Sequence, residues 1–318
     1  MKQAKALAAF SGGLDGMLAS KILIDQGIYV EAITFDSPFF DVTAGKKAAL
    51  ALNIPWRAVD FTVDIVNLLF SPPSGFGKNM NPCIDCHATM FKRLKELAVA
   101  EGFDFIFSGE VVGQRPMSQN RSALNRVKNI SEAGDFLLRP LSAKLLPATL
   151  MEENGLVDRE KLLDISGRGR KRQLAMAKDF SFSLVPSPGG GCLLTDPGYA
   201  KRLRTLRDAE LLTGENARMI KLGRMFLLDE AVGLVGRNSA ENQEMLVTKE
   251  GIQLDIQEVP GPLGILLGKV TQENLVLLTS IMASYTKADK PVIALSNDGR
   301  SISADIIDCD KRAKYSVF

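Results

Sequence analysis

Short apolar runs typical of buried strands alternate with stretches of helical spacing along the first 110 positions. The strand-like runs cover residues 6–10, 29–35, 57–61 and 103–107, and the helical stretches cover residues 14–26, 43–52 and 91–100. Strand, helix and strand at this pitch form right-handed βαβ units around a parallel sheet that helices cover on both faces. The pattern therefore predicts an α/β fold with a doubly wound parallel sheet.

The pattern changes twice further along the chain. Residues 140–182 are helical and basic, and the loop 186–191 precedes a helix at 199–212. The C-terminal residues alternate at 225–235, 251–256 and 291–295 around a helical stretch at 272–285. We therefore predict three segments: an α/β domain over residues 1–185, a linker with a cysteine loop over 186–218, and a smaller α+β domain over 219–318.

Composition is that of an ordinary globular protein, with 318 residues of which 46% are hydrophobic and 24% charged. Only a short apolar stretch precedes Ser11, and no run approaches the roughly 18 apolar residues of a membrane span. We therefore expect a cytoplasmic protein without membrane contact. Its four cysteines are too few for a disulfide framework and favour metal or redox chemistry in a reducing compartment.

Positive charge gathers in the middle of the chain. The formal net charge is +2, but residues 115–207 contain 17 Lys and Arg against 9 Asp and Glu. Such a segment attracts phosphate groups while the whole chain stays nearly neutral. A solvated basic helix face is the alternative interpretation.

A glycine turn follows the first predicted strand, at the point where a helix begins. It consists of Ser11, Gly12, Gly13, Leu14, Asp15 and Gly16. Glycines let the backbone approach a ligand closely, and the free N–H groups at a helix start suit a phosphate. A Gly-Gly helix cap is the alternative.

This turn resembles the PP-loop, SGGxDS, although Gly16 stands where that family has Ser. The resemblance implies that the turn binds the pyrophosphate end of ATP while the nucleotide is split into AMP and pyrophosphate. It also implies that Asp15 takes part in catalysis, and that Phe35 and Asp36 lie near the adenine.

A second polar loop, residues 109–119, follows the apolar run 103–107. Ligands of doubly wound sheets bind at the carboxyl ends of strands near the reversal of strand order, so this loop is expected to face the glycine turn. Its GE, GQ and SQ pairs resemble the corresponding loop of tRNA 4-thiouridine synthetases, and LRPL at residues 138–141 fits the segment that follows there. We expect Gly109 and Gln114 at the ATP and Arg115 at a phosphate or base edge. A polar surface turn is the alternative.

Two cysteines open the helical stretch of residues 91–100, in the segment NPCIDCH at residues 81–87. The dipole of a helix favours a thiolate at its N-terminus, which suits metal ligation or nucleophilic use. The spacing also matches a haem-attachment pattern, which belongs outside the cytoplasm, while structural zinc prefers a second cysteine pair. A redox pair is a further alternative. His87 is expected to lie at the helix start or behind the metal ligands rather than to act as a general base.

Cys192 follows the glycines of the loop 186–191. Certain PP-loop thiouridine synthetases resemble this chain in having a CxxC pair and a remote cysteine that converge on the nucleotide site. The resemblance implies that Cys83, Cys86 and Cys192 bind three irons of a 4Fe-4S cluster, whose open iron carries a sulfide. Without a cluster, Cys192 or Cys86 would carry a persulfide. A small buried core residue is the alternative for Cys192, and Cys309 has no assigned role.

Two further segments are candidates for RNA contact. Residues 166–173 supply a basic patch of Arg168, Arg170, Lys171 and Arg172, for which a capped, solvated helix is the alternative. Further along, VGRN at residues 235–238, EN at 241–242 and PGP at 260–262 resemble the RNA-binding domain of the NFACT ribosome quality-control proteins. That resemblance implies Arg237 and Asn238 as RNA contacts, and a hairpin turn stabilised by Asn is the alternative.

Together these features predict an ATP-dependent tRNA sulfurtransferase. ATP, with Mg²⁺, would adenylate a uridine carbonyl, and a sulfur nucleophile from sulfide or a cysteine desulfurase would displace AMP. Two alternatives stay open: a PP-loop ligase or amidotransferase acting on a small metabolite, and a non-catalytic RNA-binding protein.

Overall fold

The computed structural model describes residues 3–187 and 192–317 and divides into two compact units, Met1–Cys192 and Leu193–Phe318. This division falls between the two boundaries expected from the sequence, so the helices α8 (Pro197–Asp208) and α9 (Gly214–Met219) belong to the C-terminal unit. No helix in the described part of the chain combines the length and apolar character needed to cross a membrane.

The N-terminal unit is built on a five-stranded parallel sheet in the order β3-β2-β1-β4-β5. Its strands are β1 (Lys5–Ala9), β2 (Tyr29–Asp36), β3 (Trp56–Asp60), β4 (Phe105–Ser108) and β5 (Leu137–Leu138). The chain runs from β1 to β3 toward one edge and then returns to place β4 on the other side of β1. This confirms the predicted doubly wound sheet, and the strand order reverses between β1 and β4.

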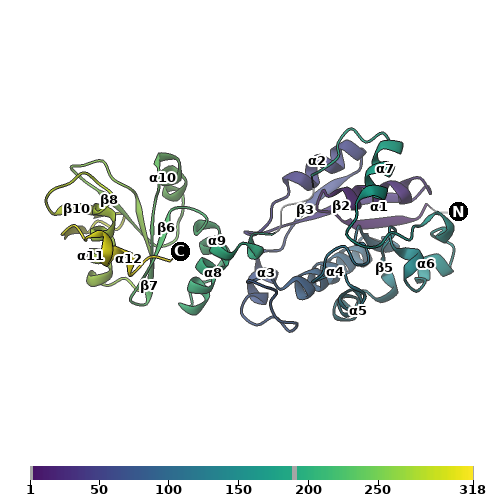
Figure 1. The fold of residues 1–318 in the computed structure, drawn as a ribbon, viewed down its shortest axis with the longest axis horizontal. Helices are drawn as coiled ribbons and strands as arrows, with labels where there is room; N and C mark the ends of the chain where they lie inside the picture. The colour runs from purple at the N-terminus through teal and green to yellow at the C-terminus, as the bar shows by residue number, and fades with distance from the viewer. Residues whose placement is uncertain (1–2, 188–191, 318) are drawn as a thin grey trace. The chain divides into compact units, whose positions relative to one another are not determined.

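Helices cover both faces of this sheet (Figure 1). One face carries α1 (Leu14–Ile24), α2 (Thr43–Leu52) and α7 (Lys171–Asp179), and the other carries α3 (Thr62–Leu68), α4 (Cys83–Ala100) and α5 (Arg121–Ile130). A short helix, α6 (Leu150–Glu153), follows β5. Because β1 is buried on both faces, its central residues Ala6, Leu7 and Ala8 are all apolar and at most 1% exposed.

The C-terminal unit contains a six-stranded sheet in the order β11-β10-β8-β9-β7-β6, in which all neighbours are antiparallel. Its strands are β6 (Arg224–Leu228), β7 (Ala231–Val235), β8 (Ile252–Ile256), β9 (Gly264–Gly268), β10 (Val292–Ser296) and β11 (Ser301–Ala304). Its further helices are α10 (Ser239–Leu246), α11 (Gln272–Ala283) and α12 (Cys309–Ala313). Leu275, Leu278 and Ile281 of α11 are fully buried against the sheet, which confirms the predicted α+β class.

Candidate functional site at the carboxyl ends of β1 and β4

The glycine turn after β1 is held in a shape that only glycine allows. Gly12 has a φ of +80°, and a Cβ there would overlap the backbone carbonyl of Ala44. Gly13 is the N-cap of α1 and has an extended backbone. No side chain of the described residues forms a capping hydrogen bond at this position. The first N–H groups of α1 therefore have no side-chain cap and suit an anion.

The loop after β4 packs directly on this turn. A Cβ on Gly109 would overlap the backbone of Asp15 and Gly16, so the two loops touch through backbone atoms. The Gln114 Nε2 amide donates to Oδ2 of Asp15 at 2.7 Å. The two loops expected to face one another therefore meet at the reversal of strand order.

Two side-chain oxygen atoms lie buried without a hydrogen-bond partner among the described residues where the two loops meet. These atoms are Asp15 Oδ1 and Gln114 Oε1. Carboxylate and amide oxygens are the ligands that Mg²⁺ prefers, so this donor set fits the predicted cation. Asp15 and Gln114 would hold Mg²⁺, which would neutralise phosphate charge there.

A buried ionic network lies behind the same loop. Glu110 accepts from Arg139 Nε at 2.8 Å and pairs with His87 Nδ1 at 3.0 Å. Burial alone would raise the pKa of Glu110, but the Arg139 and His87 charges and hydrogen bonds outweigh it and lower that pKa to about 2. Sequence reasoning missed this role of Glu110, although Glu110 and Arg139 follow the adjacent strands β4 and β5.

The cysteine pair opens α4, as the sequence predicts. Cys83 accepts a hydrogen bond from Asn81 Nδ2 at 3.2 Å, and both cysteines are half-buried. Burial raises the pKa of the Cys86 thiol well above its usual value, and the nearby sulfurs of Cys192 and Cys83 and the Asp85 carboxylate raise it further. At Cys86, burial and the negative neighbours therefore act against the thiolate that the helix dipole favours.

Cys192 lies beside the Cys83 and Cys86 pair, since its sulfur acts electrostatically on the Cys86 thiol. The glycines before Cys192, at 188–191, lie outside the described residues. Within 3–187 and 192–317, no group of three or more His, Cys, Asp and Glu side chains is arranged to hold a metal ion. The thiols of Cys83 and Cys192 are close enough to Cys86 to act on it electrostatically, although the three are not grouped as metal ligands among the described residues.

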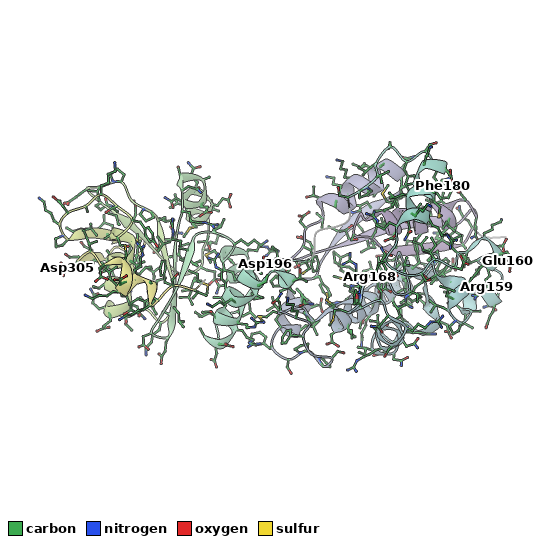
Figure 2. The ribbon with its side chains drawn as sticks, viewed as in Figure 1. Arg159, Glu160, Arg168, Phe180, Asp196 and Asp305 are labelled. Atoms are coloured by element: carbon green, nitrogen blue, oxygen red, sulfur yellow. The ribbon has the colours of Figure 1, made fainter. Side chains whose placement is uncertain are left out.

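The basic segment at residues 166–173 lies beside the second loop. Ser166 forms a parallel bridge with Val112, and Gly167 N donates to Val112 O at 2.8 Å. The side chains of Arg168, Lys171 and Arg172 are exposed, while Arg170 is half-buried (Figure 2 labels Arg168). Arg172 pairs with Asp164 at 2.8 Å, and Arg115 is exposed on the loop itself.

Three other predicted contacts have partners inside their own units. The Phe35 ring is 6% exposed and packs on Phe61 with centroids 5.3 Å apart. Asn238 is the N-cap of α10, where its Oδ1 accepts from Glu241 N at 3.0 Å. Arg237 pairs with the Glu241 carboxylate at 2.7 Å. These contacts give Asn238 and Arg237 structural roles in the α10 region.

Comparisons with known proteins cover both units. Residues 223–308 match the family model of the NFACT protein RNA binding domain. The tRNA-specific 2-thiouridylase MnmA of Caldicellulosiruptor saccharolyticus is 26% identical over 221 residues, which are 62% of this chain and 58% of that protein. The corresponding enzyme of Thiobacillus denitrificans is 30% identical over 163 residues, 45% of each chain.

A solved 4-thiouridine synthetase–RNA complex with bound ATP is 18% identical and has a TM-score of 0.41, covering 68% of this chain and 53% of that one. The chain therefore spans about half to three fifths of the length of these relatives. The resemblances read from the sequence are confirmed: the chain is similar to tRNA-specific 2-thiouridylases, and residues 223–308 match the NFACT protein RNA binding domain.

Proposed function

We propose that this protein is an ATP-dependent tRNA sulfurtransferase that adenylates a uridine carbonyl and replaces its oxygen with sulfur. One chain of contacts carries the proposal. Gly109 packs on the start of α1, the next residue, Glu110, pairs with His87, and His87 directly follows Cys86. A phosphate-binding turn and a group of thiols are thus joined through a single loop.

Adenylation solves the chemical difficulty of the reaction, because a carbonyl oxygen is a poor leaving group. The uridine oxygen attacks the α-phosphorus of ATP and releases pyrophosphate, which the amides of the glycine turn stabilise. Gln114 positions Asp15 through their 2.7 Å hydrogen bond. Mg²⁺, when bound by Asp15 and Gln114, supplies positive charge to the phosphates.

Sulfur transfer then uses two neighbouring thiols. A persulfide on Cys86 or Cys192 attacks the activated carbon through its terminal sulfur and displaces AMP. The second thiol attacks the sulfur still bound to the first cysteine, which releases the thiolated base and leaves a Cys86–Cys192 disulfide for an external thiol to reduce. The raised pKa of Cys86 supports a persulfide as the attacking species, because a persulfide ionises more readily than a thiol.

A 4Fe-4S cluster on Cys83, Cys86 and Cys192 is the second candidate sulfur carrier, and the adjacency of the three residues favours it. No reaction step is assigned to it. Iron and acid-labile sulfide analysis of anaerobically purified protein separates the candidates: about three to four irons per chain support the cluster, and iron-free active protein supports the persulfide.

The substrate assignment rests on charge and on similarity. Arg115 is exposed on the second loop itself, and Arg168 and Lys171 are exposed in the segment that pairs with this loop. All three can contact tRNA phosphates. The curated relatives are tRNA-specific 2-thiouridylases, and the C-terminal residues resemble an RNA-binding domain. A cysteine desulfurase would supply the outer sulfur of the persulfide. Free sulfide would supply it by attacking the Cys86–Cys192 disulfide, which gives one persulfide and one thiol.

Reconstitution tests the function. Purified protein, ATP, Mg²⁺, a cysteine desulfurase with cysteine, a reducing thiol and unmodified tRNA are combined, and nucleosides are analysed by mass spectrometry. We expect a thiouridine, together with one AMP and one pyrophosphate for each sulfur incorporated. Cys192→Ser should abolish the thiouridine, whereas Glu160→Gln, at a side chain that is 89% exposed, should retain it. Formation of ADP, or ATP consumption that is driven by a small metabolite and not by tRNA, would contradict the proposal.

A further inference from the structure

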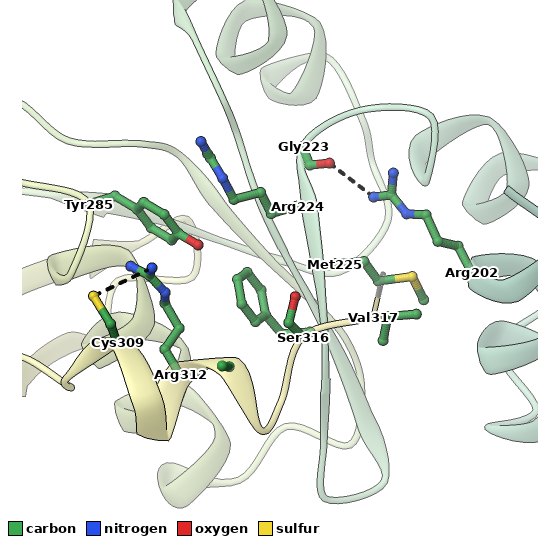
Figure 3. Close-up of a pocket in the computed structure, with 11 residues that line it drawn as sticks. Arg202, Gly223, Arg224, Met225, Tyr285, Cys309, Arg312, Ser316 and Val317 are labelled. Carbon is green, nitrogen blue, oxygen red and sulfur yellow. Dashed lines mark hydrogen bonds between the residues drawn. The ribbon is translucent and has the colours of Figure 1, made fainter. Parts of the chain in front are cut away.

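The C-terminal unit contains a cavity of about 270 Å³ that the sulfur-transfer chemistry does not use. Its walls come from the start of β6, from Tyr285 after α11, from α12 and from the residues that follow α12 (Figure 3). Three arginines line it, Arg202 of α8, Arg224 of β6 and Arg312 of α12. We call these arginines together with Tyr285 the arginine pocket.

Tyr285 organises two of the guanidinium groups. The Cζ atoms of Arg224 and Arg312 lie 4.4 and 4.2 Å from the centre of its ring. Arg312 Nη1 also donates to Ser284 Oγ at 2.9 Å, and Arg224 Nη1 donates to the Gly236 carbonyl at 3.3 Å. The cations are therefore fixed in place, and the ring they cover offers a nucleobase little free surface for stacking.

The positive charge of the pocket lacks acidic partners. The lining contains no Asp or Glu, and within the described residues none of the three arginines forms an ion pair with a carboxylate. Other arginines of this unit do have such partners: Arg237 pairs with Glu241, and Arg300 pairs with Asp298. Glu241 acts electrostatically on Arg202 from outside the lining, but three guanidinium groups around one cavity with no carboxylate in its lining form a site for an anion.

Arg202 is a half-buried member of the pocket with a donor atom that stays unsatisfied within the described part of the chain. It donates to the carbonyls of Leu222 and Gly223 at 3.0 and 3.1 Å, and its buried Nε has no partner among the described residues. Burial lowers the pKa of Arg202 to about 10, and the charge of Arg237 adds to this effect. Arg202 stays protonated at neutral pH, and a bound anion would relieve the repulsion.

We propose that the arginine pocket binds a backbone phosphate of RNA, and so anchors the tRNA on the C-terminal unit. The identity of that RNA rests on the proposed function. Two observations favour RNA over other anions: the residues similar to an RNA-binding domain, 223–308, include Arg224 and Tyr285, and guanidinium forks match phosphate oxygens. Because the aromatic ring is covered, the pocket reads charge and not base identity.

Binding of labelled tRNA to the full-length protein, measured by fluorescence anisotropy at several salt concentrations, tests the pocket. The variant Arg224→Gln/Arg312→Gln should weaken binding at least about 10-fold and reduce the slope of log affinity against log salt by about one to two. Arg300→Gln, in the same unit, is the matched control and should leave both values near those of the wild type. Circular dichroism establishes that each variant is folded.

A footprint on the wild type makes the test independent of folding defects. Cys309 is exposed on the pocket wall, with its Sγ 3.8 Å from Arg312 Nη2 (Figure 3). Its alkylation rate, resolved by peptide mass spectrometry, should fall several-fold when tRNA is added. Protection by inorganic phosphate but not by tRNA would identify a free-anion site and overturn the RNA assignment.

The outcomes separate this proposal from the enzymatic one. Wild-type protein that thiolates tRNA, while the double variant keeps the wild-type salt slope and Cys309 stays unprotected, overturns the pocket alone. Pocket-dependent tRNA binding and Cys309 protection without any thiouridine formation support the pocket and overturn the proposed sulfur transfer.

Discussion

The two units make their candidate sites in different ways. In the N-terminal unit the backbone itself forms the site. Gly109 lets the loop after β4 pack on the backbone of Asp15 and Gly16, and Gly12 lets the turn after β1 pack on Ala44 of α2. In the C-terminal unit an antiparallel sheet and its flanking helices support long side chains, and the site is a set of guanidinium groups around Tyr285.

This difference decides how each site responds to change. A site made of backbone atoms has no spare room, so one added methyl group displaces a whole loop. In a site made of arginine side chains, each substitution removes one positive charge and leaves the backbone in place, so affinity falls stepwise. Substitutions whose effects do not follow this difference between the two sites would contradict the comparison.

The largest effect is expected from Gly12→Ala. The added Cβ would overlap the Ala44 carbonyl and would require a φ of +80° that alanine avoids. Because a misplacement of about 1 Å costs on the order of 100-fold in rate, tRNA-dependent AMP formation should fall by at least that factor. Wild-type AMP formation by Gly12→Ala would contradict the backbone-built site.

The next effect is expected from Glu110→Gln, which leaves the buried Arg139 charge without its partner. Breaking a buried ion pair in this way should lower the free energy of unfolding by about 3–5 kcal/mol, measured by urea titration at pH 7. Glu160→Gln is the matched control, because the Glu160 side chain is 89% exposed, and it should change little.

The same carboxylate predicts a pH dependence. The pKa of Glu110 is lowered from 4.5 to about 2, so the stabilisation it gives is present above pH 4.5 and is lost as the pH falls toward 2. Glu110→Gln should therefore lose less stability than the wild type between pH 5 and pH 3. Parallel losses for the two proteins would show that Glu110 is not ionised against Arg139 and His87.

A smaller effect is expected from Asn238→Ala in the C-terminal unit. Removing this N-cap of α10 should reduce stability by about 1 kcal/mol, as measured by thermal unfolding. Weakening of tRNA affinity beyond the change caused by instability would support Asn238 as an RNA contact as well as an N-cap.

The smallest effect, and one of opposite sign, is expected from Gly16→Ala. Gly16 lies within α1, and a Cβ there would meet the Phe10 ring at 3.4 Å, close to ordinary contact. Alanine in a helix is more stable than glycine by about 0.5–1 kcal/mol, so the melting temperature should rise slightly while AMP formation persists. A loss as severe as that of Gly12→Ala would show that the whole turn requires glycine.

Sequence patterns predicted the N-terminal unit well because its central strands β1 and β4 lie in short apolar runs and the loops that follow them are polar. The run 225–235 was expected to be one alternating stretch, but it folds into β6 and β7 joined by a turn in which Glu230 has a φ of 50°. Apolar residues on both sides and the absence of a glycine hid that turn.

The site was partly visible in the sequence. The meeting of Asp15 with Gln114 follows from the topology of a doubly wound sheet, which places the ends of β1 and β4 together. The ionic network around Glu110 could not be predicted, since it depends on which side chains turn inward from α4, β4 and β5. The raised pKa of Cys86 likewise depends on burial and on Cys192, which lies far away in the sequence.

The path of the departing oxygen tests the central claim most directly. A tRNA whose uracil carbonyls carry a heavy oxygen isotope is incubated with the protein, ATP and a cysteine desulfurase with cysteine, and the AMP is analysed by mass spectrometry. Activation of the carbonyl by adenylation predicts one heavy oxygen in the AMP for every thiouridine formed. Thiouridine formation with unlabelled AMP would show that ATP does not activate the base.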